Sequence, residues 1–416
     1  MSSFRGGIPP AERPISLAVR PPPLAKNSDK QPTPPLTPVS PADAVGASFS
    51  QSRPATADVE TDTKPIAPPE IFEIDEFEYD IELERDENGE PLEFGRGAWS
   101  VVHPASSRGI PTRTGRQSPP PSPERSRTVF AVKSPLRADA RPLLKKEARL
   151  LTRLLRIPGN KLHLVPFHGY IPESNSLVMT AVPLSLSDYI QSQASVAQKT
   201  FSTKTMFDPM LGTFPWLRLS EQLVEGLQWL HSCAQVVHGD LKPHNIRLRP
   251  RAFCGNSNVA DVFPFDPLFA DFTSSHDRAS RHHDPEHQNL ALSALTPPFV
   301  APELLTVSSL TSADAVPSTS SDIFSLAVTL LAAATGDLIL YPCSGNMQLL
   351  AMSREGHRII DHVRSGPHCS RVPRNGIVEK ILSPAFLRKP NARIQPSEWL
   401  RLIARETDEL RSTKAV

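Results

Sequence analysis

Apolar residues alternate with polar ones in the first half of the chain, a pattern typical of β-strands. Between residues 72 and 83 the alternation has one slip and leaves an acidic opposite face; its apolar members are Phe72, Ile74, Phe77, Tyr79, Ile81 and Leu83. Residues 129–133 form a short, almost wholly apolar run that ends in a lysine. Residues 162–171 and 176–182 predict two further strands, joined by a turn at Pro-Glu-Ser-Asn.

Helical spacing takes over farther along the chain. Residues 141–155 carry five leucines and Glu147 on one broad face, and residues 216–233 form a strongly amphipathic helix pattern. Residues 323–335 are almost wholly apolar but too short to cross a bilayer, so we expect a buried helix there. Strands followed by helices indicate an α+β protein with two lobes.

Proline is the unusual feature of the composition. The 416 residues include 45 prolines and 19 glycines, and 15 of the prolines fall in the first 70 residues. Such a segment cannot bury enough apolar surface to offset its ordering entropy, so residues 1–70 are predicted to be a disordered tail. The tail is either passive or regulatory. As a regulatory segment it offers Thr37 and Ser40, which precede prolines, to a proline-directed kinase, and its proline run to an SH3 or WW module.

Charge and cysteine content exclude several classes of protein. The formal net charge is +1, which provides no global field for nucleic acid or a membrane surface. The four cysteines lie far apart without a Cys-x-x-Cys pair, so neither a zinc ribbon nor a disulfide-rich secreted scaffold is expected. The N-terminal residues have no apolar core of a secretory signal. We therefore expect an intracellular protein, either cytoplasmic or nuclear.

Two motifs in the strand region suggest phosphate chemistry. Gly95 and Gly97 lie in the run Phe-Gly-Arg-Gly-Ala-Trp-Ser, where glycines allow the backbone to approach phosphates, although a simple hairpin turn explains them equally well. Lys133 ends its strand, where an ammonium can bind phosphate oxygens or simply reach solvent. Glu147 lies on the apolar face of a helix and needs a partner, for which Lys133 is the candidate.

Two motifs in the second half add a catalytic loop and a metal ligand. His-Gly-Asp-Leu-Lys-Pro-His-Asn, residues 238–245, brings Asp240, Lys242 and Asn245 together between apolar flanks. This set suits phosphoryl transfer, because a carboxylate can orient a hydroxyl, a lysine can neutralise the transferred phosphate and an amide oxygen can bind a divalent cation. Asp271, which follows a short strand, would be a second hard oxygen ligand for Mg²⁺.

Taken in this order, the motifs resemble the eukaryotic protein kinase family, Ser/Thr type, from about residue 72 to about residue 409. The resemblance implies a small antiparallel sheet lobe with one helix and a larger, mainly helical lobe. It also implies that Lys242 marks the Ser/Thr type. The other matching positions are Gly95, Gly97 and Val102 in the glycine-rich loop, Ala131, Lys133, Glu147, Met179 as gatekeeper, Asp240, Asn245, Asp271, Thr296, Ala301-Pro302-Glu303, Asp322 and Arg393.

Besides Ser100, which stands where the family usually has a third glycine, the sequence departs from the family pattern at two positions. Gly239 replaces the arginine before the catalytic aspartate, and Thr273 replaces the glycine of Asp-Phe-Gly. Asp261 is a rival for the metal-binding aspartate at a shorter spacing, but the strand before Asp271 favours the latter. The histidine-rich residues 281–287 are expected to be a solvated loop rather than a metal cluster, because Pro285 interrupts a helical histidine face.

The resemblance implies an ATP- and Mg²⁺-dependent kinase that phosphorylates Ser and Thr residues of protein substrates. In this interpretation Lys133, held by Glu147, positions the phosphates, Asn245 and Asp271 hold Mg²⁺, and Asp240 orients the attacking hydroxyl. The alternative is a pseudokinase used for binding or scaffolding. A small-molecule kinase is disfavoured, because Thr296 and residues 301–303 resemble the part of the family that binds protein substrates. The expected divisions are a tail, 1–70, a small lobe, 71–182, with a proline-rich loop at 106–127, a large lobe, 183–410, and a C-terminal tail, 411–416.

Overall fold

The computed structural model describes residues 73–107, 129–200, 202–251, 262–279, 296–311 and 316–414. The chain divides into two units, residues 1–70 and residues 71–416, and every described residue belongs to the second. Several predicted features lie outside the described residues. They are the tail, nearly all of the loop at 106–127, Asp261 and the histidine-rich residues 281–287.

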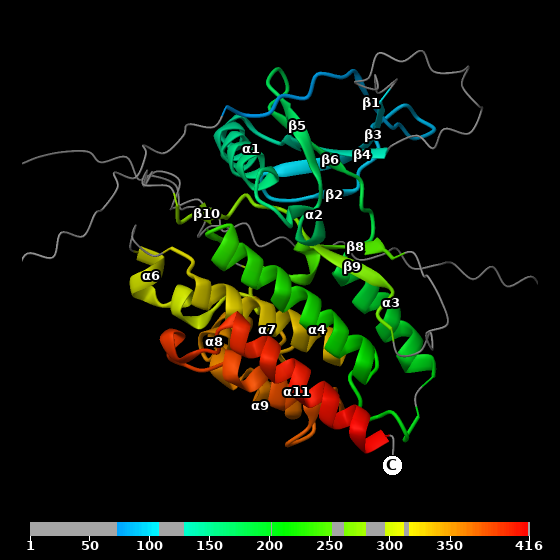
Figure 1. Cartoon of the computed structure of the whole chain (residues 1–416), viewed down its shortest axis with the longest axis vertical. Coiled ribbons are helices and arrows are strands. Elements are labelled where there is room, and N and C mark those ends of the chain that lie inside the picture. The colour runs from blue at the N-terminus through cyan, green and yellow to red at the C-terminus, as the bar shows by residue number, and fades with distance from the viewer. Residues whose placement is uncertain are drawn as a thin grey trace, which may run out of the picture. The chain divides into compact units, whose positions relative to one another are not determined.

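One lobe is built around a six-stranded antiparallel sheet (Figure 1). Its strand order is β1-β3-β4-β6-β5, with β2 pairing to β3 off this path. Helix α1 (Arg141–Leu155) packs on the sheet through the buried leucines of its apolar face. The strands are β1 (Ile81–Leu83), β2 (Gly95–Arg96), β3 (Ser100–Ser107), β4 (Val129–Pro135), β5 (Phe167–Ile171) and β6 (Ser176–Thr180).

Three strand predictions in this lobe were too long, the one at 176–182 by only two residues, because β6 ends at Thr180. The expected strand at 72–83 is reduced to β1, although Glu76 forms a single bridge to Tyr170 on β5. The expected strand at 162–171 begins only at Phe167, because residues 160–163 form the short helix α2 (Asn160–His163). Leu162 in that helix is 66% exposed, so its apolar side chain does not mark a buried strand. The helix at 141–155 is confirmed. The strand at 129–133 is confirmed but continues to Pro135, so Lys133 lies within it and does not end it.

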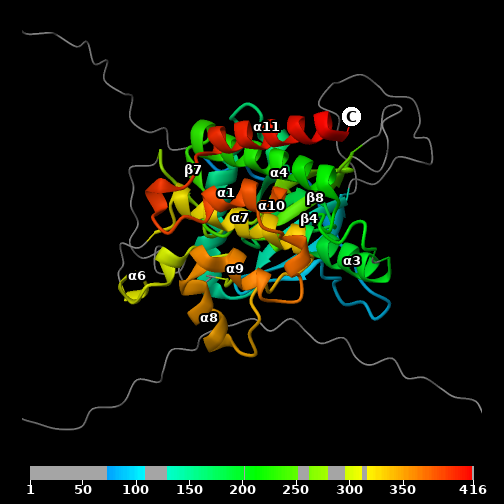
Figure 2. The ribbon, with the colours of Figure 1, turned by 90° about the horizontal axis from the view of Figure 1, so that it is seen from below.

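The other lobe is mainly helical and packs around α7, whose side chains are nearly all buried. Figure 2 shows α7 in the middle of this lobe and α11 alongside α4. Its helices are α3 (Leu186–Lys199), α4 (Thr213–Gln228), α6 (Val307–Thr311), α7 (Thr319–Thr335), α8 (Asn346–Arg354), α9 (Ile359–Arg364), α10 (Ile377–Leu382) and α11 (Pro396–Lys414). Its short strands are β7 (Val236–Val237), β8 (Ile246–Pro250), β9 (Phe265–Phe269) and β10 (His276–Asp277).

Helix α7 has strong signals at both ends. The Ser318 hydroxyl accepts from Ser321 N at 3.1 Å, and Ser321 Oγ accepts from Ser318 N at 2.8 Å, which forms a capping box. Gly336 ends the helix with φ of 81°, a left-handed conformation that suits glycine. The predicted buried helix is thereby confirmed, and no helix in the described ranges is long and apolar enough to span a membrane.

The end of the chain and the end of α4 differ from expectation in detail. Helix α11 continues to Lys414, so the expected lobe boundary at residue 410 falls inside it. The predicted helix at 216–233 is α4 followed by one π turn, Trp229–Cys233, closed by Ala234 N donating to Trp229 O at 2.9 Å. A π turn is rare and is often found next to a functional site.

Candidate active site

The glycine-rich segment forms the turn between β2 and β3. Gly95 pairs with Val102, and Val102 pairs in turn with Lys133 on β4. Gly97 N donates to Ser100 O at 2.8 Å, which closes the turn. Among the described residues, a Cβ atom on Gly95 would meet nothing within 4 Å, and one on Gly97 would meet only Ser100 O at 3.7 Å. The backbone of this turn is therefore open to an approaching ligand.

Lys133 and Glu147 form a buried ion pair. Lys133 Nζ donates to Glu147 Oε2 at 2.7 Å and to Oε1 at 2.9 Å. Their side chains are only 4% and 1% exposed. Strand β4 and helix α1 bring the two residues together, so Lys133 is the partner that the carboxylate on the apolar helix face required.

Asp271 joins this pair from the other lobe. Lys133 Nζ donates to Asp271 Oδ1 at 2.8 Å and to Thr273 Oγ1 at 2.9 Å. Phe272 N donates to Glu147 Oε1 at 2.9 Å, which ties the same segment to α1. Asp271 has a φ of 63°, a left-handed conformation in which a non-glycine residue is uncommon. The segment after β9 is therefore held against the small lobe by both members of the ion pair.

The electrostatics of this cluster follow from the opposed charges. Burial by itself lowers the pKa of the Lys133 ammonium, but the charges of Asp271 and Glu147 outweigh it, and the pKa lies well above its usual value. Burial raises the pKa of Asp271, but Lys133 and the Thr273 hydroxyl outweigh it, and that pKa lies well below its usual value. Both groups therefore carry full charge at neutral pH.

The loop at 238–245 places its polar side chains close together. Lys242 Nζ lies 2.7 Å from Asp240 Oδ2. Asn245 Nδ2 donates to Asp240 Oδ2 at 3.0 Å and to Asp240 O at 2.8 Å. Burial raises the pKa of Asp240, and Lys242 only partly offsets this rise. Lys242 Nζ also donates to Thr296 Oγ1 at 3.0 Å, which links the loop to the segment before residues 301–303.

Asp322, at the start of α7, holds the backbone of that loop. Its Oδ2 accepts from His238 N at 2.8 Å, and its Oδ1 accepts from Gly239 N at 2.9 Å. His231 Nε2, on the π turn, lies 3.0 Å from Asp322 Oδ2. Gly239 has a φ of 82°, and a Cβ there would lie 2.5 Å from Ser274 O. Glycine therefore fits this position without strain, where a larger residue would force a shift.

Two ion pairs hold the chain after Asp271, one at Asp277 on β10 and one at Glu303. Arg393 binds Glu303 through two parallel bonds, Nη1–Oε1 at 2.6 Å and Nη2–Oε2 at 2.7 Å, and the Arg393 side chain is fully buried. Arg153 Nε, on α1, lies 2.8 Å from Asp277 Oδ2 on β10. The contact between Arg393 and Glu303 joins two of the positions at which the sequence resembles the family. Neither Arg153 nor His231 was predicted, because each lies on an amphipathic helix pattern without a local motif.

Met179 lies on β6 and pairs with Ala131 on β4. Ala131 is buried, and Met179 is partly buried and packs against the core. Their strands carry both residues beside Lys133, which pairs with Leu177. The predicted site residues of β2, β3, β4, α1 and β6 thus belong to one sheet and its helix.

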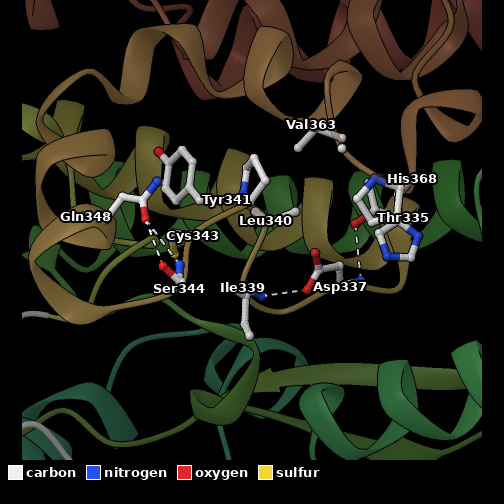
Figure 3. Close-up of a pocket in the computed structure, with 13 residues that line it drawn as sticks. Thr335, Asp337, Ile339, Leu340, Tyr341, Cys343, Ser344, Gln348, Val363 and His368 are labelled. Carbon is white, nitrogen blue, oxygen red and sulfur yellow. Dashed lines mark hydrogen bonds between the residues drawn. The ribbon is translucent and has the colours of Figure 1, made fainter.

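A cavity of about 390 Å³ lies elsewhere, in the helical lobe beyond the end of α7. Figure 3 shows Tyr341, Gln348 and Ser344 on one side of it and Thr335, Asp337 and His368 on the other. None of the predicted site residues lines it. We assign this cavity no part in the chemistry of the loop and the ion pair.

The residues present fit a magnesium–nucleotide complex. The carboxylate of Asp271 is 43% exposed, and no described residue bonds its Oδ2. The side-chain nitrogen of Asn245, Nδ2, donates to Asp240, which leaves the side-chain oxygen Oδ1 for another partner. Carboxylate and amide oxygens are the hard ligands that Mg²⁺ prefers. Among the described residues, this site included, no group of three or more His, Cys, Asp or Glu side chains that could hold a metal ion is found.

Comparison with known proteins identifies the family. The sequence model of the family described as protein kinase domain matches residues 141–401, more than half of the chain. No curated protein matches the sequence. The matched span includes Glu147, Asp240, Asn245 and Asp271, whereas the glycine-rich turn and Lys133 precede it. With an antiparallel sheet in one lobe, helices in the other and this family match, the chain belongs to the protein kinase family and has its two-lobed α+β fold.

Proposed function

We propose that the protein is an active kinase that transfers the γ-phosphoryl group of ATP to Ser and Thr residues of protein substrates. One observation carries the proposal: Lys133 contacts both Glu147 and Asp271, so the two lobes meet at a single charged cluster. A protein kinase needs the lysine–glutamate pair and the metal-binding aspartate in place together. Their assembly supports the enzyme over the pseudokinase, the rival function.

In this proposal bound Mg²⁺–ATP supplies the phosphoryl group, and the cation neutralises phosphate charge. Asp271 and Asn245 offer oxygen ligands to the cation, and Lys133 offers its ammonium to phosphate oxygens. The open turn at Gly95 and Gly97 lets backbone amides approach the same phosphates. These groups act by positioning and by charge stabilisation.

Asp240 orients the substrate hydroxyl and accepts its proton. Its raised pKa makes the carboxylate a better proton acceptor than an exposed aspartate. Lys242, 2.7 Å from Asp240, places positive charge where the phosphoryl group passes. Its bond to Thr296 supports Ser/Thr specificity, because the resemblance links both residues to that type.

Control of this kinase differs from that of relatives with an arginine before the catalytic aspartate. Gly239 has no charge for a phosphorylated residue to neutralise. The ion pair between Arg153 and Asp277 already ties β10 to α1. We therefore propose that activity does not depend on phosphorylation of the segment between residues 274 and 293. Residues 1–70 are proposed to act as a separate tail, available to a proline-binding module or a proline-directed kinase.

The test is a phosphotransfer assay. Full-length protein is incubated with labelled ATP, Mg²⁺ and generic protein substrates rich in Ser and Thr, beside an Asp240→Asn control. Labelled phosphoserine or phosphothreonine that disappears in the control supports the proposal. If label is absent from the wild-type reaction, or if Asp240→Asn transfers it at the wild-type rate, the catalytic assignment is wrong.

A further inference from the structure

Thr273 has a side chain at the position where the family has glycine, and its hydroxyl lies inside the charged cluster. Thr273 Oγ1 lies 2.6 Å from Asp271 Oδ1, 2.9 Å from Lys133 Nζ and 3.1 Å from Glu147 Oε2. A glycine has no atom that could make these contacts. The substitution therefore adds a polar group to the core of the proposed site.

The roles of the hydroxyl follow from its single proton. Lys133 has only protons to give, so Thr273 Oγ1 accepts from it and keeps its own proton for a carboxylate. Asp271 Oδ1 is the nearer of the two carboxylate oxygens, so the hydroxyl donates to Asp271. A hydrogen bond to a charged acceptor is about twice as strong as one between neutral groups. Thr273 thus connects the ammonium and the carboxylate in one chain of bonds.

The two oxygens of Asp271 are left in different states. Oδ1 accepts hydrogen bonds from Lys133 Nζ, from Thr273 Oγ1 and, at 3.4 Å, from Thr273 N. No residue in the described part of the chain donates to Oδ2. Since the side chain is 43% exposed, the unbonded oxygen is accessible. The three contacts on Oδ1 fix the rotation of the carboxylate and hence the direction of Oδ2.

We propose that Thr273 is a positioning residue, whose hydroxyl holds Asp271 so that one carboxylate oxygen stays free for a divalent cation. This inference rests on the proposed function, because it assumes that Asp271 is a metal ligand. The Thr273 side chain is β-branched, so it is also limited in rotation and keeps the hydroxyl in place. Removing the hydroxyl should weaken Mg²⁺ binding, and restoring it on another side chain should restore the binding.

The test compares full-length wild type with four variants. Thr273→Val keeps the shape and loses the hydroxyl, Thr273→Ser keeps the hydroxyl, Thr273→Gly introduces the family residue, and Asp271→Asn removes the proposed ligand. Each protein is saturated with a non-hydrolysable ATP analogue and titrated with MgCl₂ in excess over the analogue, and the thermal midpoint is recorded. Midpoints without Mg²⁺ reveal variants that only destabilise the fold, and the Mg²⁺ dependence of KM and kcat is measured in parallel.

We expect Thr273→Val and Thr273→Gly to need about tenfold more Mg²⁺ for half of the midpoint shift, equivalent to about 1.4 kcal/mol. Thr273→Ser should titrate like the wild type. Suppose that Asp271→Asn needs more Mg²⁺ than the wild type. If Thr273→Val then titrates like the wild type, or if Thr273→Ser does not restore wild-type Mg²⁺ binding, the role of Thr273 is overturned and the proposed function stands. If Asp271→Asn also titrates like the wild type, or if Mg²⁺ shifts no midpoint, the metal assignment and the proposed function both fail.

Discussion

Asp322→Asn is a sharp perturbation because the new side chain keeps its shape but cannot keep its bonds. Both oxygens of Asp322 accept from backbone donors, Oδ1 from Gly239 N and Oδ2 from His238 N. An asparagine has one oxygen and one amide nitrogen, so in either orientation its NH₂ group faces a backbone N–H. One charge-assisted bond is lost, and one buried donor loses its partner.

The magnitude follows from these two losses. A hydrogen bond to a charged group contributes about 1.5–3 kcal/mol, and a buried unpaired donor costs about 1–3 kcal/mol. Because both losses arise from the same broken hydrogen bond, they do not add in full, and the free energy of unfolding should fall by about 3 kcal/mol. Gly239 precedes Asp240, so displacement of this loop should also lower phosphotransfer on the order of 10²-fold.

The assay is urea unfolding, with phosphotransfer measured on the same preparations. Asp337→Asn is the matched control, because partly buried Asp337 accepts from one backbone donor, Ile339 N at 2.9 Å, in a solvent-exposed bond that an amide oxygen can replace. The control should stay within about 0.5 kcal/mol of wild type. An Asp322→Asn protein that unfolds like the control would refute the reasoning.

The difference between Asp322→Asn and wild type should depend on pH. Burial raises the pKa of Asp322, but the bonds from His231 and Gly239 outweigh it, and the net pKa lies below its usual 3.8. A carboxyl with a lowered folded-state pKa contributes stability that is present above its usual pKa and is lost as pH falls through the folded value. The difference in the free energy of unfolding between the two proteins should therefore narrow as the pH falls below 3.8.

The other predictions concern catalysis, control and the tail. Asp240→Asn and Lys133→Ala should each lower phosphotransfer on the order of 10²–10⁴-fold, and the double variant should lose much less than the product; a full product would show that the two act independently. Phosphatase-treated protein should keep its activity, whereas Asp277→Asn, which breaks the ion pair with Arg153, should lower it; loss after phosphatase alone would contradict this. A chain beginning at Pro68 should have the thermal midpoint of the full protein, and a clear drop would show that the tail stabilises the kinase domain.

Local pattern and motif were enough to locate most of the candidate site. A helical period on residues 141–155 with one carboxylate on its apolar face predicted both α1 and the partner that Glu147 needs. The apolar run at 323–335 predicted a buried helix, which is α7. Such signals are local, because a helix with one buried face has an apolar residue on that face at every turn, and this period is visible in the sequence.

Prediction was poorest where burial and pattern disagree. Leu162 continues the apolar run of the expected strand, yet it lies exposed on α2. The turn at Gly159, with φ of 90°, begins that helix and redirects the chain before β5. An exposed apolar residue looks the same in a sequence as a buried one, so the start of the strand was misplaced.

The sequence by itself determined that a strand region precedes a mainly helical one, the family motifs and the chemical groups that the site contains. Only the tertiary structure decided how those groups combine. It placed the Thr273 hydroxyl between Lys133 and Asp271, and it placed Asp322 on the backbone at Gly239. The bond between Lys133 and Asp271 joins residues 138 positions apart. Contacts of this kind leave no periodic trace in a sequence, because they depend on how separate elements pack and not on which face of one element is buried.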